Sequence, residues 1–310
     1  MTLYFKENNT FKILQMTDLH YHHGNKHQGD DELTISLLEQ LVDIEKPDFV
    51  MFTGDILIAY EETDVTDGLE ALLKGVTKHN IPWAYVFGNH DHEKGISKEL
   101  FIKTQQSIPN CYTIAGPNNI SGMGNFVLDI KDKNSNEIGA RLFCLDSHDY
   151  PKTDQGKYAW IDESQIKWFQ EQTASITPKI PSFVFFHIPL PEYNDAWEST
   201  DKIGSKNEKV CCPEVNSHFF DAMVDSQHVL ACFVGHDHIN DFCAAYRGID
   251  LNYGRMGGHH TYGKEGFLKG GKIIEITKNQ WTYKVWCRLK DNSIVNEALR
   301  DPKQTLNLSR

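Results

Sequence analysis

Short apolar runs alternate with amphipathic segments along the first hundred residues. Strand-like runs cover residues 11–16, 49–52 and 83–87. Segments in which apolar residues recur every three or four positions, which is helical spacing, cover residues 31–45, 67–79 and 97–106. Because strands and helices alternate, the pattern predicts a parallel sheet with crossover helices.

The pattern changes after residue 111. Predicted strands occupy residues 112–115, 125–131, 140–145, 182–186, 229–234, 242–246, 249–253, 272–277 and 281–289, and predicted helices occupy residues 162–175 and 213–224. The polar segment 189–217 is too long for an ordinary connection, so it is either a substrate-selecting lid or a disordered insertion. We predict one domain over residues 1–290, with that insertion, and a peripheral polar tail over residues 291–310.

Residues that can bind metals stand at the ends of five predicted strands. The apolar run 229–234, for example, leads directly into Gly-His-Asp-His. The candidates are Asp18, His20, Asp55, Asn89, His90, His187, His236 and His238. In such sheets, ligands gather beyond the carboxyl ends of the strands. Carboxylate, imidazole and amide oxygen ligands suit manganese, iron or zinc ions.

Seven of these residues can serve two ions only if one carboxylate is shared, since an ion takes about four protein ligands. Two ions about 3.5–4 Å apart would polarise a phosphoryl oxygen and lower the pKa of a water between them. Taken singly, Asp18, Asp55, Asn89 or Asp91 would be read as a helix cap, and His187 as a core residue. Four histidines at matching strand ends favour the metal site instead.

The series of motifs resembles that of the calcineurin-like metallophosphoesterases. DLH stands at residues 18–20, GD at 54–55, GNHD at 88–91, a single histidine at 187 and GHDH at 235–238. The motifs follow the family's order over residues 11–240. The resemblance implies an α/β (α+β) fold of four layers, α/β/β/α, in which two packed mixed β-sheets are flanked by helices.

The resemblance also implies a role for each motif residue. Asp18, His20 and His238 would bind one ion, Asn89, His187 and His236 the other, and Asp55 both. His90 would protonate the leaving-group oxygen and clamp the phosphate, which suits an imidazole, and Asp91 would orient His90. A hydroxide between the ions would attack phosphorus in line. The cofactors would be two divalent or trivalent ions, which are manganese, iron or zinc, with manganese or iron preferred.

Ile56, Leu57 and Ile58 distinguish the chain from two branches of that family. Ser/Thr protein phosphatases continue after GD with a Val-Asp-Arg-Gly type of run, and purple acid phosphatases have a metal-binding tyrosine at the position of Ile58. The motifs are more similar to the phosphodiesterase-like branch and to phosphatases of the yeast Dcr2 type. The expected activity is hydrolysis of phosphate monoesters or diesters. A catalytically silent scaffold that binds proteins and a nuclease are the alternatives.

The formal net charge of -12 argues against nucleic acid or an anionic membrane as the main partner. The seven cysteines are odd in number and form no CxxC pair, which favours a reducing compartment. The N-terminal residues lack the apolar run of a signal peptide, and no apolar run is long enough to span a bilayer. We therefore predict a cytoplasmic protein.

Three histidines follow the first motif in a polar loop. His22 and His23 are close to His20 in sequence, so they either line the substrate pocket or lie in solvent. A solvated loop is the simpler interpretation of His27.

Three further residues are candidate substrate contacts. His148 follows a predicted strand and has the same two interpretations as His22. Arg255 and His259 stand in a glycine-rich run over residues 254–263. They either contact a phosphate group or belong to a plain turn.

Overall fold

The structure, a computed structural model, describes residues 2–23, 27–152 and 154–307. Its strands are β1 (Leu3–Tyr4), β2 (Thr10–Met16), β3 (Phe49–Thr53), β4 (Trp83–Val86), β5 (Phe126–Lys131), β6 (Ile138–Cys144), β7 (Ser182–Phe185), β8 (Lys202–Ile203), β9 (Val229–Val234), β10 (Cys243–Tyr246), β11 (Ile249–Tyr253), β12 (Gly270–Thr277), β13 (Tyr283–Leu289) and β14 (Ile294–Arg300). Its helices are α1 (Gln28–Glu45), α2 (Glu62–Thr77), α3 (Lys98–Ser107), α4 (Glu163–Ala174), α5 (Glu192–Trp197) and α6 (Phe219–Ser226), with a 3-10 turn at Pro302–Asn307.

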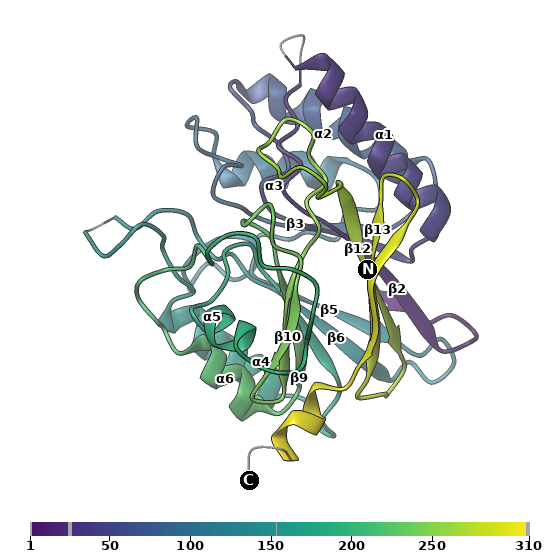
Figure 1. The fold of residues 1–310 in the computed structure, drawn as a ribbon, viewed down its shortest axis with the longest axis vertical. Coiled ribbons are helices and arrows are strands. Elements are labelled where there is room, and N and C mark those ends of the chain that lie inside the picture. The colour runs from purple at the N-terminus through teal and green to yellow at the C-terminus, as the bar shows by residue number, and fades with distance from the viewer. Residues whose placement is uncertain (1, 24–26, 153, 308–310) are drawn as a thin grey trace.

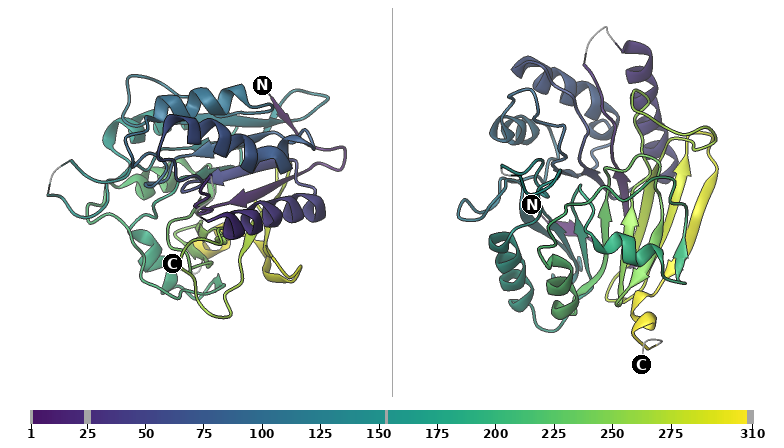
Figure 2. Two further views of the ribbon diagram at one scale, coloured as in Figure 1. Left: turned by 90° about the horizontal axis from the view of Figure 1, so that it is seen from above. Right: turned by 60° about the vertical axis from the view of Figure 1, so that its left-hand side comes forward.

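The strands form two sheets (Figure 1). The eight-stranded sheet has the order β1-β5-β6-β7-β9-β11-β10-β8, and the six-stranded sheet has the order β14-β13-β12-β2-β3-β4. The C-terminal strands, yellow in Figure 2, therefore lie in the same sheet as the purple N-terminal strand β2.

Three apolar cores hold the layers together. Helices α1, α2 and α3 pack on the six-stranded sheet, where Leu41 and Phe52 are buried in one cluster. Helices α4 and α6 pack on the eight-stranded sheet, where Phe169 and Val184 share a second cluster. The third core lies between the sheets and takes side chains from β2, β3 and β12 on one side and from β5, β6, β7 and β9 on the other. The predicted four-layer α/β/β/α fold is confirmed.

The strands that carry the motifs run parallel within each sheet. β3 pairs in parallel with β2 and β4, and β7 pairs in parallel with β6 and β9. Parallel pairing gathers the carboxyl ends of these strands at one edge of each sheet. The segments that follow β2, β3, β4, β7 and β9 carry all eight predicted site residues.

Three predicted elements differ from the structure. Residues 112–115 form no strand, because β4 meets this segment through a single bridge between Trp83 and Cys111. Helix α6 begins at Phe219 rather than at residue 213. The interpretation of residues 189–217 as a disordered insertion is wrong, because the segment contains α5 and β8, and Tyr193 of α5 is fully buried. A lid role for this segment stays a prediction.

The prediction of a peripheral tail after residue 291 is wrong for residues 294–300. These residues form β14, which pairs antiparallel with β13. Arg300 is buried, and its guanidinium donates to the Asp250 carboxylate of β11 at 2.6 and 3.0 Å and to Asp201 at 2.7 Å. This ion pair joins the edge strand of one sheet to the other sheet. The tail residues 308–310 lie outside the described residues.

Replacing Arg300 by methionine tests this ion pair between the sheets. The variant leaves the fully buried Asp250 carboxylate without its cation, so we expect the free energy of unfolding to fall by about 3–5 kcal/mol. Arg247→Met is the matched control, because Arg247 pairs with Asp221 at the surface, where a pair contributes about 0–1 kcal/mol. Urea unfolding followed by circular dichroism measures both variants. Equal losses would contradict the buried role of Arg300.

Candidate metal centre

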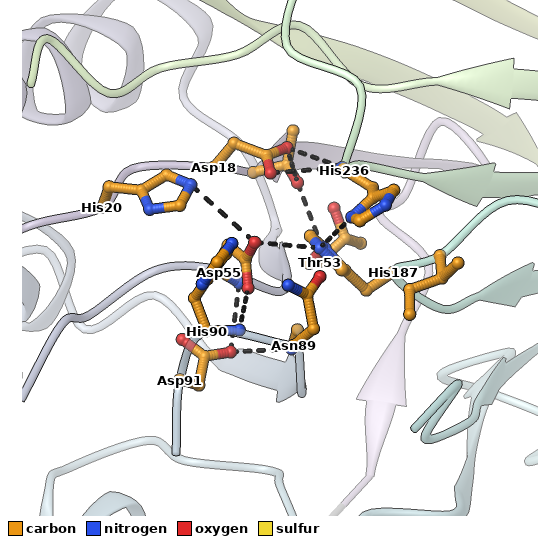
Figure 3. A network of polar contacts seen from close by, with 12 residues as sticks. Asp18, His20, Thr53, Asp55, Asn89, His90, Asp91, His187 and His236 are labelled. Carbon is orange, nitrogen blue, oxygen red and sulfur yellow. Dashed lines mark hydrogen bonds and ion pairs between the residues drawn. The ribbon is translucent and has the colours of Figure 1, made fainter. Parts of the chain in front are cut away.

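The strand-end residues converge where the carboxyl edges of the two sheets meet (Figure 3). Asp18, His20 and His238 form a first trio, in which each residue offers a ligand atom within 4.8 Å of the others. Asp55, His187 and His236 form a second trio by the same measure. The structure thus brings six of the seven predicted metal ligands together in two groups.

Asp55 belongs to the second trio and also faces the first trio. Its Oδ2 is 3.1 Å from His187 Nε2, in its own trio, and 3.8 Å from His20 Nε2, in the other. Within the trios, the imidazole nitrogens of His20 and His238 are 3.3 Å apart, as are those of His187 and His236. A carboxylate in this place can be shared by two ions.

Asn89 and His236 each have a buried polar atom that no described residue satisfies. Asn89 Oδ1 and His236 Nε2 have no hydrogen-bond partner. The amide nitrogen of Asn89 donates to Tyr150 Oη at 3.1 Å, which leaves its oxygen available as a ligand. An unpaired buried polar atom costs about 1–3 kcal/mol, and coordination of a cation by Asn89 Oδ1 would remove that cost. The nitrogen of His236 that faces the second trio is Nδ1, 3.3 Å from His187 Nε2. The combined set of carboxylates, imidazoles and an amide oxygen fits two divalent ions.

Hydrogen bonds from outside the trios orient two of the imidazoles. His187 Nδ1 lies 2.8 Å from the carbonyl oxygen of Thr53, so that Nε2 faces Asp55. His238 Nδ1 lies 2.5 Å from Thr261 Oγ1. Such contacts fix the ring and the tautomer of a metal-binding histidine. Sequence analysis did not identify Thr261, which stands far from the motif that it supports.

The backbone at the strand ends adopts the left-handed conformation that non-glycine residues rarely occupy. The φ angles are 52° at Asp18, 43° at His20, 53° at Asp55 and 76° at His236. Each such residue costs about 1–3 kcal/mol and persists where its surroundings enforce it. Here His20 N donates to Asp55 O at 2.9 Å, and His236 N donates to Asp18 Oδ2 at 3.0 Å.

Two motif glycines let these turns approach one another. A Cβ atom at Gly88 would overlap Asp55, and one at Gly235 would overlap Thr17 and Asp18. The glycines of the GNHD and GHDH motifs are therefore explained by close packing of the ligand-bearing turns.

Burial and charge set the protonation of the imidazoles. Burial lowers the pKa of His20 to about 4 and that of His236 to about 3. Burial also opposes protonation of His187, but the Asp55 carboxylate outweighs it and raises the pKa of His187 to about 10. Without a cation, His187 therefore carries the proton that balances Asp55. A cation bound here would displace that proton.

His90 stands at the edge of the centre with its ring centroid 5.4 Å from that of His20. Its Nδ1 is 2.9 Å from Glu93 Oε2, and Glu93 Oε1 accepts a hydrogen bond from Tyr150 Oη at 2.8 Å. Burial opposes ionisation of Glu93, but the hydrogen bonds from His90 and Tyr150 prevail and lower its pKa. Sequence analysis missed Glu93 and Tyr150. The one signal for Glu93 was its place three residues after His90.

Asp91 does not orient His90, so that prediction is wrong. Its carboxylate is buried and accepts hydrogen bonds from the backbone N–H groups of Asp55, Ile56 and Gly88, at 3.1, 2.9 and 2.7 Å. It accepts further bonds from Leu57 N and Tyr85 Oη. These donors turn the side chain inward, where it ties the turn after β3 to the turn after β4.

Arg255 is not available for a phosphate, so that interpretation is also wrong. Its guanidinium is buried, forms an ion pair with Asp241, donates to the carbonyl oxygen of Leu268 at 2.7 Å and lies over the ring of Phe267. Because its charge is balanced by Asp241 and its side chain is buried, Arg255 holds the fold together.

The other predicted substrate contacts make their contacts outside the two trios, and a role for them in substrate binding stays a prediction. His148 Nε2 is 2.9 Å from Gln165 Oε1, and the backbone N–H of His259 donates to Thr34 of α1 at 3.1 Å. His23 lies beside Gly68 of α2. His22 groups with two other histidines. Within the described ranges, no hydrogen bond or ion pair joins any of these residues to the trios.

Comparison with known proteins places these features in a family. The model of the calcineurin-like phosphoesterase family matches residues 11–240. The chain is 31% identical to "Probable inactive purple acid phosphatase 14" of Arabidopsis thaliana, over 98% of this chain and 87% of that protein. It is 34% identical to "Phosphatase DCR2" of Saccharomyces cerevisiae, over 90% of this chain and 54% of that protein.

Two solved structures support the fold alone, because each is 12% identical in sequence to this chain. A dimetal phosphatase from Danio rerio has a TM-score of 0.63 and matches 94% of this chain and 98% of its own. GAP50, titled as the anchor in the inner membrane complex of Plasmodium, has a TM-score of 0.59. It matches 94% of this chain and 89% of its own. On the family model and these relatives, the chain belongs to the calcineurin-like phosphoesterase family.

Proposed function

We propose that this chain hydrolyses phosphate esters with two metal ions held by the two trios and Asn89. The observation that carries the proposal is the convergence of both trios on Asp55, beside the buried Asn89 Oδ1, which has no hydrogen-bond partner. Phosphate monoesters and diesters are both candidate substrates.

Each ion would have its own ligands. Asp18, His20 and His238 would hold one, Asn89, His187 and His236 the other, and Asp55 both. Bound ions of this kind supply Lewis acidity at a phosphoryl oxygen and lower the pKa of a water. Oxygen ligands suit manganese, and imidazoles suit iron or zinc; of these ions we propose manganese or iron. The chain has isoleucine at position 58, where purple acid phosphatases have their metal-binding tyrosine, so that ligand is absent.

His90 would protonate the departing oxygen. Glu93 accepts a hydrogen bond from Nδ1 of the His90 ring, so Nε2 is the nitrogen that would face the substrate. The His90 side chain is 38% exposed, so a substrate can reach it. A cavity of about 420 Å³ lies beside Glu93, the partner of His90, and is lined by Asn89, His92, Glu93, Lys94, Asp149 and Tyr150. This cavity is the candidate place for the leaving group.

A catalytically silent scaffold is the second candidate, because a relative carries "inactive" in its name and a neighbour in fold is titled an anchor. Loss of ligands or of the acid would be expected in such a scaffold. Here all eight motif positions hold residues that suit catalysis, so we favour the enzyme. A nuclease is disfavoured by the net charge of -12.

The cytoplasmic location stays a prediction from the sequence. All seven cysteines are free. Across the part of the chain that the structure describes, no helix combines the length and apolar character needed to cross a membrane.

Replacing His90 by alanine tests the proposed acid. We expect the variant to keep both ions and to lose about 10²–10⁴-fold in kcat on p-nitrophenyl phosphate or its bis-ester with added manganese, because proton donation is lost. Asp55→Asn should lose metal as well as activity. His218→Ala, which removes the exposed histidine just before α6, is the control. A catalytically silent scaffold would show no turnover in the parent or in any variant. An unchanged rate in His90→Ala would refute the role of His90 as the acid.

Replacing Glu93 by glutamine tests whether Glu93 positions His90. Proton donation matters most for a poor leaving group, so the variant should lose more activity on phenyl phosphate than on p-nitrophenyl phosphate. Metal content should stay at the parent level. Glu99→Gln on α3 is the matched control. A loss of the same size on both substrates would assign Glu93 a general structural role instead.

A further inference from the structure

A third group of histidines lies outside the two trios. His22, His27 and His260 each offer a ring nitrogen within 4.8 Å of the others. Their ring centroids are 4.7 Å apart for His22 and His27, 4.6 Å for His22 and His260, and 3.6 Å for His27 and His260. His260 comes from a loop far away in the sequence, so the tertiary fold, and not a local run of histidines, creates the group.

Two carboxylates accompany these histidines. Asp30 Oδ2 is 3.7 Å from His260 Nδ1. Asp31 is 5% exposed, and its Oδ1 accepts a hydrogen bond from His22 N at 2.9 Å, while its Oδ2 is buried without a hydrogen-bond partner. Both residues belong to the first turn of α1, so negative charge is concentrated beside the three imidazoles.

The group differs from histidines that merely face solvent. All three side chains are partly buried. His27 is the N-cap residue of α1, but its side chain makes no cap hydrogen bond, so its nitrogens are not committed to the helix. The positive end of a helix carries about half a unit charge and disfavours a cation. Asp30 and Asp31 outweigh that charge.

We propose that His22, His27 and His260 bind a zinc ion, with the Asp30 carboxylate as the fourth ligand. Three imidazoles and one oxygen ligand in a tetrahedron are a common zinc environment, with Zn–N distances of about 2.0–2.1 Å. Nitrogens already within 4.8 Å of each other need only small rotations of the rings to reach that geometry. The site is separate from the two trios and does not depend on the proposed hydrolysis.

The ion would fasten two loops to each other. One loop leads from β2 to α1 and carries His22 and His27. The other carries His260 together with Thr261 and Tyr262, which contact His238 of the first trio: Thr261 bonds its Nδ1, and the Tyr262 ring stacks on it with centroids 4.2 Å apart. The zinc ion would thus be a structural brace beside the metal centre.

Zinc content tests the proposal. The parent, His27→Ala, His260→Ala and the control His218→Ala are each loaded with zinc, desalted over a weak chelator and measured by plasma mass spectrometry. We expect both cluster variants to hold one equivalent less than the parent, and His218→Ala to match the parent. Circular dichroism verifies that each variant is folded. Two cluster variants are used so that the test still stands if one of them does not fold.

The same comparison in an Asp55→Asn background separates this site from the trios. Asp55→Asn should lower the zinc content of every form, yet the difference of one equivalent between parent and His260→Ala should persist. Equal zinc content in parent, His27→Ala and His260→Ala would overturn the proposal, as would an equal loss in His218→Ala. Neither result depends on whether the protein hydrolyses phosphate esters.

Discussion

Contact between the carboxyl edges of the two sheets is the constraint on which the metal centre depends. Each trio takes residues from both sheets: Asp18 and His20 follow β2 whereas His238 follows β9, and Asp55 follows β3 whereas His187 and His236 follow β7 and β9. The backbone N–H of His236 bonds the Asp18 carboxylate across this boundary. Such buried polar contacts are strong because water cannot compete for them. Neither sheet alone would hold a trio.

The convergence of the candidate ligands could be predicted because two simple regularities fix their place. Alternating strands and helices imply parallel strands, and parallel strands deliver their carboxyl ends to one edge. The directions of side chains beyond those ends follow no such rule. Asp91 turns inward to five donors and Glu93 takes the place beside His90, because the turn after β4, and not the order of residues, decides which side chain faces the ring.

Predictions failed where a residue depends on a partner that is distant in sequence. A phosphate contact is one of two interpretations of Arg255, and it fails because Asp241 pairs with the guanidinium. Residues 294–300 are polar enough to suggest a tail, yet they form the edge strand β14. An edge strand exposes one backbone edge to solvent, as well as the side chains of its outer face, which explains the polar composition. The segment 189–217 looked unstructured by composition, but Tyr193 anchors it in the core. In each case tertiary contacts outweighed local composition.

The way in which the six-stranded sheet is assembled has a consequence for biogenesis. β2, near the start of the described chain, pairs with β12, and Asp250 meets its cation only in Arg300. A nascent polypeptide on the ribosome therefore exposes one edge of β2 until β12 has been translated, and Asp250 lacks its cation until Arg300 has been translated. Contacts between such distant segments form slowly, and the exposed strands are sites where chaperones are needed. The proposed metal centre would then be completed only after β12, which pairs with β2, has been translated.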